Sequence, residues 1–102
     1  MKGQFDDTAE IVNSTTLHVH GPVTNWEDDE VGAVIQARVQ VGGMSAQGAS
    51  EFIVNGDKRW KATLKGSGFA PGGPFAAYGS ATVRLDDHTS EQYDWPDEVT
   101  LT

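Results

Sequence analysis

The chain has 102 residues, the size of one compact domain, and it contains no cysteine, so neither a disulfide framework nor a thiolate zinc site is available. Its formal charge of −8 argues against nucleic acid as a partner, because phosphate binding depends on clustered Lys and Arg. We recognise no signal peptide and no membrane span in this chain, and the cytoplasm is the default expectation for its location.

The first fourteen residues carry mainly charged and small polar side chains. Their large apolar residues are few and irregularly spaced: Phe5, Ile11 and Val12. A segment of this kind is expected to be poorly tied down. We therefore predict an extended or flexible lead-in over 1–14 and a single β domain over 15–102.

Three segments in the first half of the domain show strand patterns. Around Leu17 and Val19 the apolar residues alternate with polar ones, and the pair Gly21-Pro22 is expected to end that strand. The clearest segment is 31–41, where five apolar residues share one face, followed by a Gly-Gly turn. Residues 44–49 are too rich in small side chains to assign, and 52–54 is predicted as a short strand.

The second half begins with Asn55-Gly56, which predicts a type I′ hairpin turn leading into a strand with Trp60 on its core side. Glycines and prolines over 66–74 predict a loop that crosses from one sheet to the other. Alternation returns over 77–85 and over 99–101, and the acidic stretch 86–98 between these segments is expected to separate two strands.

Six or seven short strands with no helical period predict an all-β fold, a two-sheet antiparallel immunoglobulin-like sandwich, with a small β-barrel as the alternative. The stretch Gly56–Leu64, with its Gly and Trp60, then Phe69–Gly72, Ala81–Val83 and Val99–Leu101, resembles the bacterial immunoglobulin-like repeats of surface and adhesive proteins. The resemblance implies a non-catalytic module that spaces, scaffolds or binds. It carries over no functional residue.

Two kinds of metal site are compatible with the sequence. His18 and His20 lie two apart on one predicted strand, so both imidazoles point the same way and are candidate zinc ligands, with His88 or an acidic side chain as a third. Calcium prefers several carboxylate oxygens presented by loops, and four acidic loop residues are candidates for it: Asp28, Asp29, Asp86 and Asp87. The alternative is that the histidines and acids form solvated surface, with no cofactor bound.

Three aromatic residues in predicted loops, Trp26, Tyr93 and Trp95, are candidate anchors for a partner, because aromatic rings supply a large contact area at little entropic cost. The alternative for the two tryptophans is that each closes an end of the sandwich.

No catalytic motif is present, neither a nucleophile elbow nor a phosphate loop nor a zinc-protease signature, so we predict a non-enzyme rather than a small hydrolase. The leading hypothesis is a binding or scaffolding module with a protein partner, as a component of a larger surface or phage-like assembly. The alternative is a calcium- or zinc-binding protein. A sandwich edge that another strand can join would suit the leading hypothesis.

Overall fold

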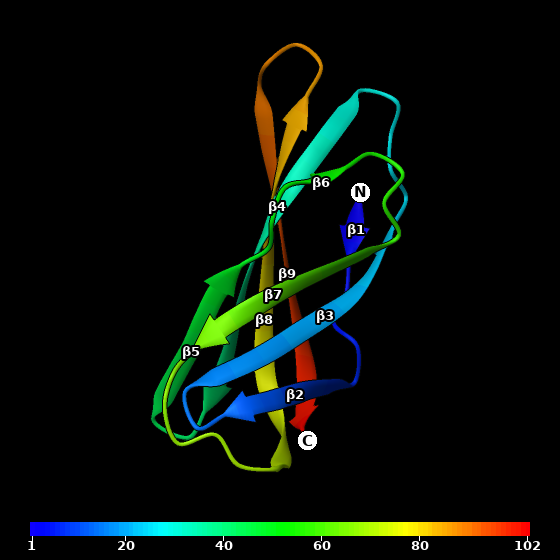
Figure 1. The fold of residues 1–102 in the computed structure, drawn as a ribbon. Helices are drawn as coiled ribbons and strands as arrows, with labels where there is room; N and C mark the ends of the chain where they lie inside the picture. Colours follow the sequence, from blue (N-terminus) through cyan, green and yellow to red (C-terminus); the bar gives the residue numbers. More distant parts are fainter.

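A computed structural model describes residues 1–102 and shows an all-β immunoglobulin-like sandwich of nine strands (Figure 1). The strands are β1 (Lys2–Gly3), β2 (Thr8–Asn13), β3 (Thr16–Thr24), β4 (Glu30–Val41), β5 (Met44–Ala49), β6 (Ile53–Val54), β7 (Arg59–Lys65), β8 (Gly72–Leu85) and β9 (Ser90–Leu101). No element is a helix of the length and apolarity that a membrane crossing requires.

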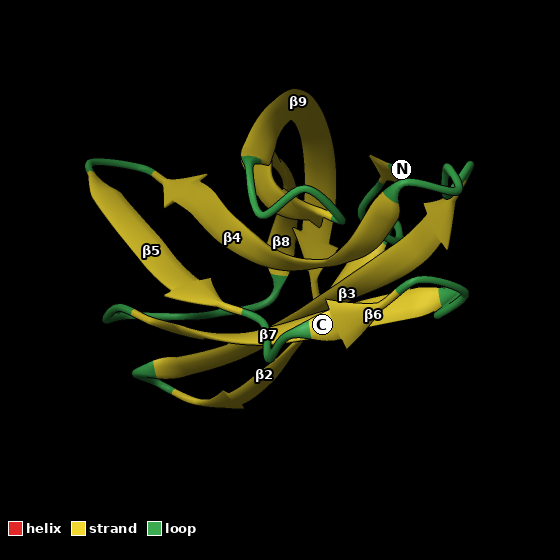
Figure 2. Cartoon of the chain, turned by 90° about the horizontal axis from the view of Figure 1, so that it is seen from above, coloured by secondary structure: helices red, strands yellow, loops and turns green.

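The strands form two layers. The front sheet contains β1, β2, β3 and β7, and the back sheet contains β5, β4, β8 and β9, with β6 attached to β4. Viewed from above, the two layers face each other (Figure 2), and the buried apolar side chains lie between them. Narrow seams join the layers at both edges: a parallel β2–β9 pairing of two residues, and one β5–β7 pair beside the isolated bridge Ser50–Ala62. The structure is therefore a sandwich, and the only barrel-like features are these two short connections between its layers.

The core consists of the inward side chains of the alternating strands, 22 buried apolar residues in one cluster. Trp60 is its largest fully buried side chain, and its ring meets Phe5 edge-on with centroids 5.0 Å apart. The predicted strands around Leu17 and over 31–41, 59–65 and 77–85 all appear as β3, β4, β7 and β8, because each buries one face and exposes the other.

Residues 1–14 are extended, but they are not a loose lead-in. β1 and β2 both pair with β3, and Phe5 and Ala9 are buried in the core. Apolar residues too sparse to show a period are sufficient here, because Phe5 enters the core and Ile11 packs against it, while Val12 stays exposed.

Two turn predictions are wrong. Gly21-Pro22 does not end a strand: β3 runs on to Thr24, and a Cβ on Gly21 would lie 1.8 Å from the Gln4 carbonyl oxygen, so glycine permits the lead-in to cross there. Asn55-Gly56 is a turn, but only Gly56 has a positive φ (99°), and the strand before it, β6, pairs with β4 rather than with β7. It is therefore no type I′ hairpin.

The acidic stretch 86–98 also differs from the prediction, because β9 already begins at Ser90. With β8 it forms a hairpin that projects beyond the sandwich, and every residue from Asp86 to Asp94 is exposed (Figure 1). A strand that is exposed on both faces has no apolar alternation, which is why the sequence pattern missed it. The unassigned segment 44–49 is β5, with Ala46 as its buried contact.

Candidate functional site

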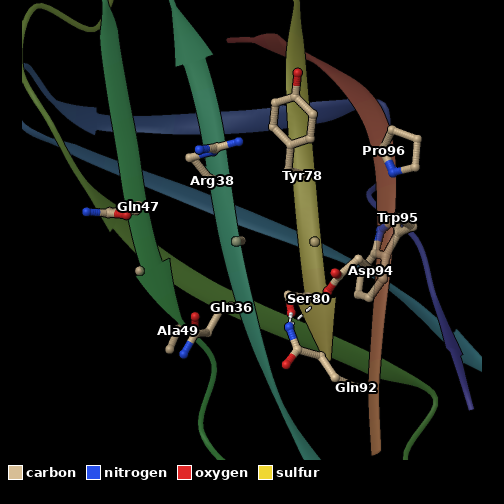
Figure 3. Close-up of a pocket in the computed structure, with 13 residues that line it drawn as sticks. Gln36, Arg38, Gln47, Ala49, Tyr78, Ser80, Gln92, Asp94, Trp95 and Pro96 are labelled. Carbon is tan, nitrogen blue, oxygen red and sulfur yellow. Dashed lines mark hydrogen bonds between the residues drawn. The ribbon is translucent and has the colours of Figure 1, made fainter. Parts of the chain in front are cut away.

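The outer face of the back sheet is concave and encloses a volume of about 750 Å³. We refer to it as the back-sheet face. Strands β4, β5, β8 and β9 each contribute side chains to it (Figure 3). The outward side chains are Gln36, Arg38, Gln47, Ala49, Tyr78, Ser80, Gln92, Asp94 and Pro96.

Strand register places these side chains in rows across the sheet. Arg38 pairs with Gln47 on one side and with Tyr78 on the other, and Tyr78 pairs with Pro96. The next row runs through Gln36, Ser80 and Asp94 in the same way. Residues directly opposite one another on a sheet face are in contact distance, so four strands distant in sequence build one surface.

Arg38 and Tyr78 form the centre of the first row. The Arg38 guanidinium lies 4.6 Å from the centroid of the Tyr78 ring, and Tyr78 is 42% exposed. The side chains of Arg38, Gln36 and Gln47 and the Tyr78 hydroxyl make no hydrogen bond within the chain, whereas the Gln92 side chain donates to Ser80 Oγ (3.0 Å) and Asp94 Oδ1 (3.2 Å). These unpaired polar groups are therefore available to a partner.

The charge on the face is balanced. Hydrogen bonding by the Ser80 hydroxyl and the Gln92 amide favours the ionised carboxylate and lowers the pKa of Asp94. With Arg38 as the one cation, the surface combines one positive charge, one negative charge and several neutral amides. Such a surface suits a polar neutral partner better than a phosphate backbone.

Trp95 supports the face from the inner side. Its indole covers Gly79, where a Cβ would lie 2.3 Å from the ring, and it also contacts Gly3 and the core residue Phe5. Its Nε1 is buried and has no hydrogen-bond partner. This candidate anchor is thus packed against the core, beneath the middle of β8.

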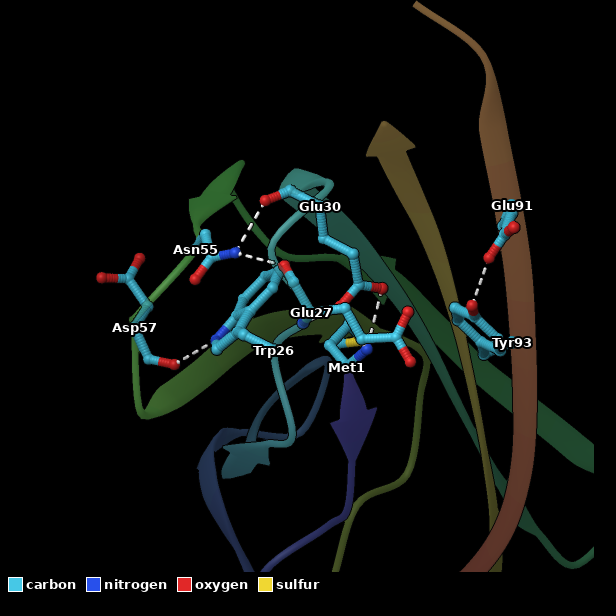
Figure 4. A network of polar contacts seen from close by, with 8 residues as sticks. All are labelled: Met1, Trp26, Glu27, Glu30, Asn55, Asp57, Glu91 and Tyr93. Atoms are coloured by element: carbon cyan, nitrogen blue, oxygen red, sulfur yellow. Dashed lines mark hydrogen bonds and ion pairs between the residues drawn. The ribbon is translucent and has the colours of Figure 1, made fainter. Parts of the chain in front are cut away.

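The other two aromatic candidates lie near one pole of the sandwich (Figure 4). Trp26 packs against the core, and its Nε1 donates to the Asp57 carbonyl oxygen at 2.8 Å. Tyr93 is 37% exposed and its hydroxyl donates to Glu91. This hydrogen bond, with smaller contributions from burial and nearby carboxylates, raises the pKa of Tyr93 to about 12.

A buried ion pair fixes the same pole. The Met1 ammonium donates to Glu30 Oε1 at 2.6 Å, and both groups are fully shielded from solvent. Glu30 Oε1 also accepts from the Glu27 N–H (2.7 Å), and the Asn55 amide donates to the Glu27 and Glu30 carbonyl oxygens (Figure 4). The asparagine that suggested a hairpin therefore ties its turn to the β3–β4 loop.

A second concave surface, of similar volume, lies outside the front sheet, and three of its polar side chains, Glu10, His20 and Arg59, belong to one network around Asp6. His20 Nδ1 lies 2.6 Å from Asp6 Oδ2 and Nε2 lies 2.5 Å from Glu10 Oε1, while Arg59 donates to Asp6. Burial opposes the charge on His20, but the hydrogen bonds to Asp6 and Glu10 outweigh it and raise the pKa of His20. Burial likewise opposes ionisation of Asp6, but Arg59 and His20 lower its pKa.

The metal candidates come together only in part. His18 and His20 do share a face of β3, but each ring nitrogen of His20 faces its own carboxylate, and His88 lies at the tip of the β8–β9 hairpin. The acidic segments do meet: the Asp86 N–H donates to the Asp29 carbonyl oxygen at 2.9 Å. No three His, Asp or Glu side chains converge in a geometry that could hold an ion. Metal binding by these residues remains the alternative hypothesis.

Comparison with known proteins supports the fold of this chain but identifies no family for it. No family model matches the chain, and no curated protein matches its sequence. Among solved structures it is similar to murine CRIg, with a TM-score of 0.52, 7% sequence identity, and coverage of 99% of this chain and 97% of that one. The similarity supports the immunoglobulin-like fold.

Proposed function

We propose that this chain is a non-enzymatic protein-binding module of a larger assembly, and that the back-sheet face contacts the partner. The observation that carries the proposal is the set of exposed, unpaired polar groups around the Arg38–Tyr78 pair. Tyr and Arg are enriched at the centres of protein interfaces, because both combine a large apolar contact area with directed hydrogen bonds.

The contrast between the two concave surfaces favours this face. On the front sheet, His20, Asp6 and Arg59 hold one another and so tie the lead-in to β3 and β7. A partner would have to break those bonds to use them. On the back sheet, Arg38 and Gln47 gain hydrogen bonds without losing any within the chain, so binding there costs less reorganisation.

Photo-crosslinking tests the proposal. A benzophenone amino acid placed at Gln47 should give a discrete adduct in an extract of the source cells, and the same group at Lys61 on the front sheet is the control. Excess unlabelled native protein should compete for the partner and abolish the adduct. For the unlabelled Arg38→Ala, Tyr78→Ala double variant, the concentration needed for the same competition should be about tenfold higher or more. Adducts from Lys61 alone, or equal competition by the variant, would refute the assignment of the face.

A further inference from the structure

The outer edge of β9 is open along most of its length. On one side β9 pairs with β8 in unbroken register from Arg84–Ser90 to Phe75–Val99, and on the other side it pairs with β2 only at Thr100 and Leu101. No strand therefore pairs with residues 90–98 on their outer side, although the Phe5 N–H donates to the Asp97 side chain at 3.1 Å.

The direction of the backbone groups follows from the register. The Thr100 N–H donates away from β8, to the Asp7 carbonyl oxygen at 2.8 Å. Because the side to which the groups point alternates along an antiparallel strand, Gln92, Asp94, Pro96 and Glu98 also direct theirs to the open side. Pro96 has no N–H to offer at such a position, and the Glu98 N–H is taken by Asp97 Oδ1 at 2.8 Å.

Gln92 and Asp94 are thus the part of the edge that can accept another strand. No hydrogen bond outside the β8–β9 ladder uses the N–H or C=O of either residue. The side chains of both lie on the back-sheet face, and Tyr93 between them is directed to the opposite side of the sheet. An added strand would face polar or acidic residues on one side and an exposed aromatic ring on the other.

The negative charge around β9 indicates which kind of strand could pair with its edge. Residues 86–102 contain six carboxylates and no Lys or Arg: Asp86, Asp87, Glu91, Asp94, Asp97 and Glu98. Two copies paired through β9 would bring like charges together, which disfavours self-association. The basic strand of this chain, β7, is not available to a second copy, because it pairs with β3 and borders β5.

We propose that the β9 edge at Gln92 and Asp94 accepts an extended, basic segment of a partner protein as an additional strand. Main-chain hydrogen bonds hold the segment, a Lys or Arg lies opposite Asp94, and an apolar residue lies opposite Tyr93. This inference goes beyond the proposed use of the back-sheet face, because the edge can be occupied whether or not a partner covers Tyr78.

The test uses a capped peptide of about nine residues with alternating Lys and Val. It is added to the isotope-labelled protein at about 150 mM salt, where exposed charges are largely screened. Hydrogen exchange of the Gln92 and Asp94 amides should slow about tenfold on binding. The matched control peptide is N-methylated at alternate residues, which keeps its charge but removes the donors of one edge. It should bind about tenfold more weakly.

Protein variants test whether the backbone edge of β9, rather than the side chains around it, binds the peptide. Gln92→Pro removes an outward N–H and should abolish binding, whereas Gln92→Ala keeps that N–H and should bind as the unmodified protein does. Tyr78→Ala should leave peptide binding unchanged, so failure of this inference and failure of the proposed function are distinguishable. The inference would be overturned if the N-methylated peptide binds as tightly as the unmodified one and the Gln92 and Asp94 amides show no slowing of hydrogen exchange. This outcome is decisive even if Gln92→Pro fails to fold. Concentration-dependent protection without peptide would also overturn it, in favour of self-association.

Discussion

The contact between Trp95 and Gly79 allows a quantitative prediction about the back sheet. A Cβ added at Gly79 would lie 2.3 Å from Cε2 and Cζ2 of Trp95, whereas carbon atoms in contact are separated by about 3.5–4.0 Å. The indole would therefore have to move by more than 1 Å, about the difference between these separations. The indole is also packed closely against Gly3, where an added Cβ would lie 2.7 Å from the ring, so it has little free space around it.

Overpacking of this kind costs about 1–3 kcal/mol, so we expect Gly79→Ala to lower the free energy of unfolding by about 2 kcal/mol and the Tm by on the order of 10 °C. Urea unfolding followed by tryptophan fluorescence measures the change. The control is Gly43→Ala, an exposed turn position with open space around the new methyl group and no left-handed φ. It should change stability by less than about 0.5 kcal/mol.

A double-mutant cycle tests the cause. In a Trp95→Ala background the obstacle is gone, and Gly79→Ala should become neutral or stabilising, because alanine suits a strand interior better than glycine. If Gly79→Ala costs as much in that background as in the native chain, the indole is not the reason that position 79 is glycine.

Three further predictions concern titration and ligands. Because the pKa of His20 is raised, its bonds to Asp6 and Glu10 stabilise the fold fully below about pH 6.5 and less as pH rises through the raised pKa. His20→Gln should therefore cost about 1 kcal/mol at pH 5.5 and little at pH 9 by urea unfolding, and equal costs would contradict this. Spectrophotometric titration of Glu91→Gln should show the pKa of Tyr93 returning from about 12 towards its usual value, and an unchanged pKa would exclude Glu91 as the cause. Finally, excess Ca²⁺ or Zn²⁺ should leave the Tm measured in EDTA unchanged, because no three ligands converge; a rise of several degrees would establish a metal site.

The strands that the sequence predicted best are those with one buried face. β4 and β8 alternate between buried and exposed positions over most of their length, so Ile35 and Ala81 could be placed in the core from the pattern alone. The first half of β9 has no such contrast, since both of its faces meet solvent, and pairing with β8 keeps it extended. Alternation of apolar and polar residues reveals a strand only where one of its faces is buried. The first half of β9 is held as a strand by its hydrogen bonds to β8, which leave no such pattern in the sequence.

The candidate face was harder to predict because no short motif encodes it. Arg38 and Tyr78 are forty residues apart in the numbering and meet only through the β4–β8 register. Their outward direction was implied by the alternation of each strand, but the alignment of the two strands was not. The aromatic candidates chosen from loop positions were less informative, since Trp26 and Trp95 both pack against the core.

The back-sheet face carries a group of neighbouring side chains whose hydrogen-bonding capacity the chain does not use internally. On the front sheet, Asp6 bonds to His20 and Arg59, and at one pole the buried Glu30 bonds to Met1 and to the Glu27 N–H. The free side-chain amides of Gln36 and Gln47, the Arg38 guanidinium and the open backbone groups of Gln92 all belong to the back sheet. In the free protein water bonds to these exposed groups, so the proposed partner can replace that water at the back sheet without breaking a hydrogen bond within the chain.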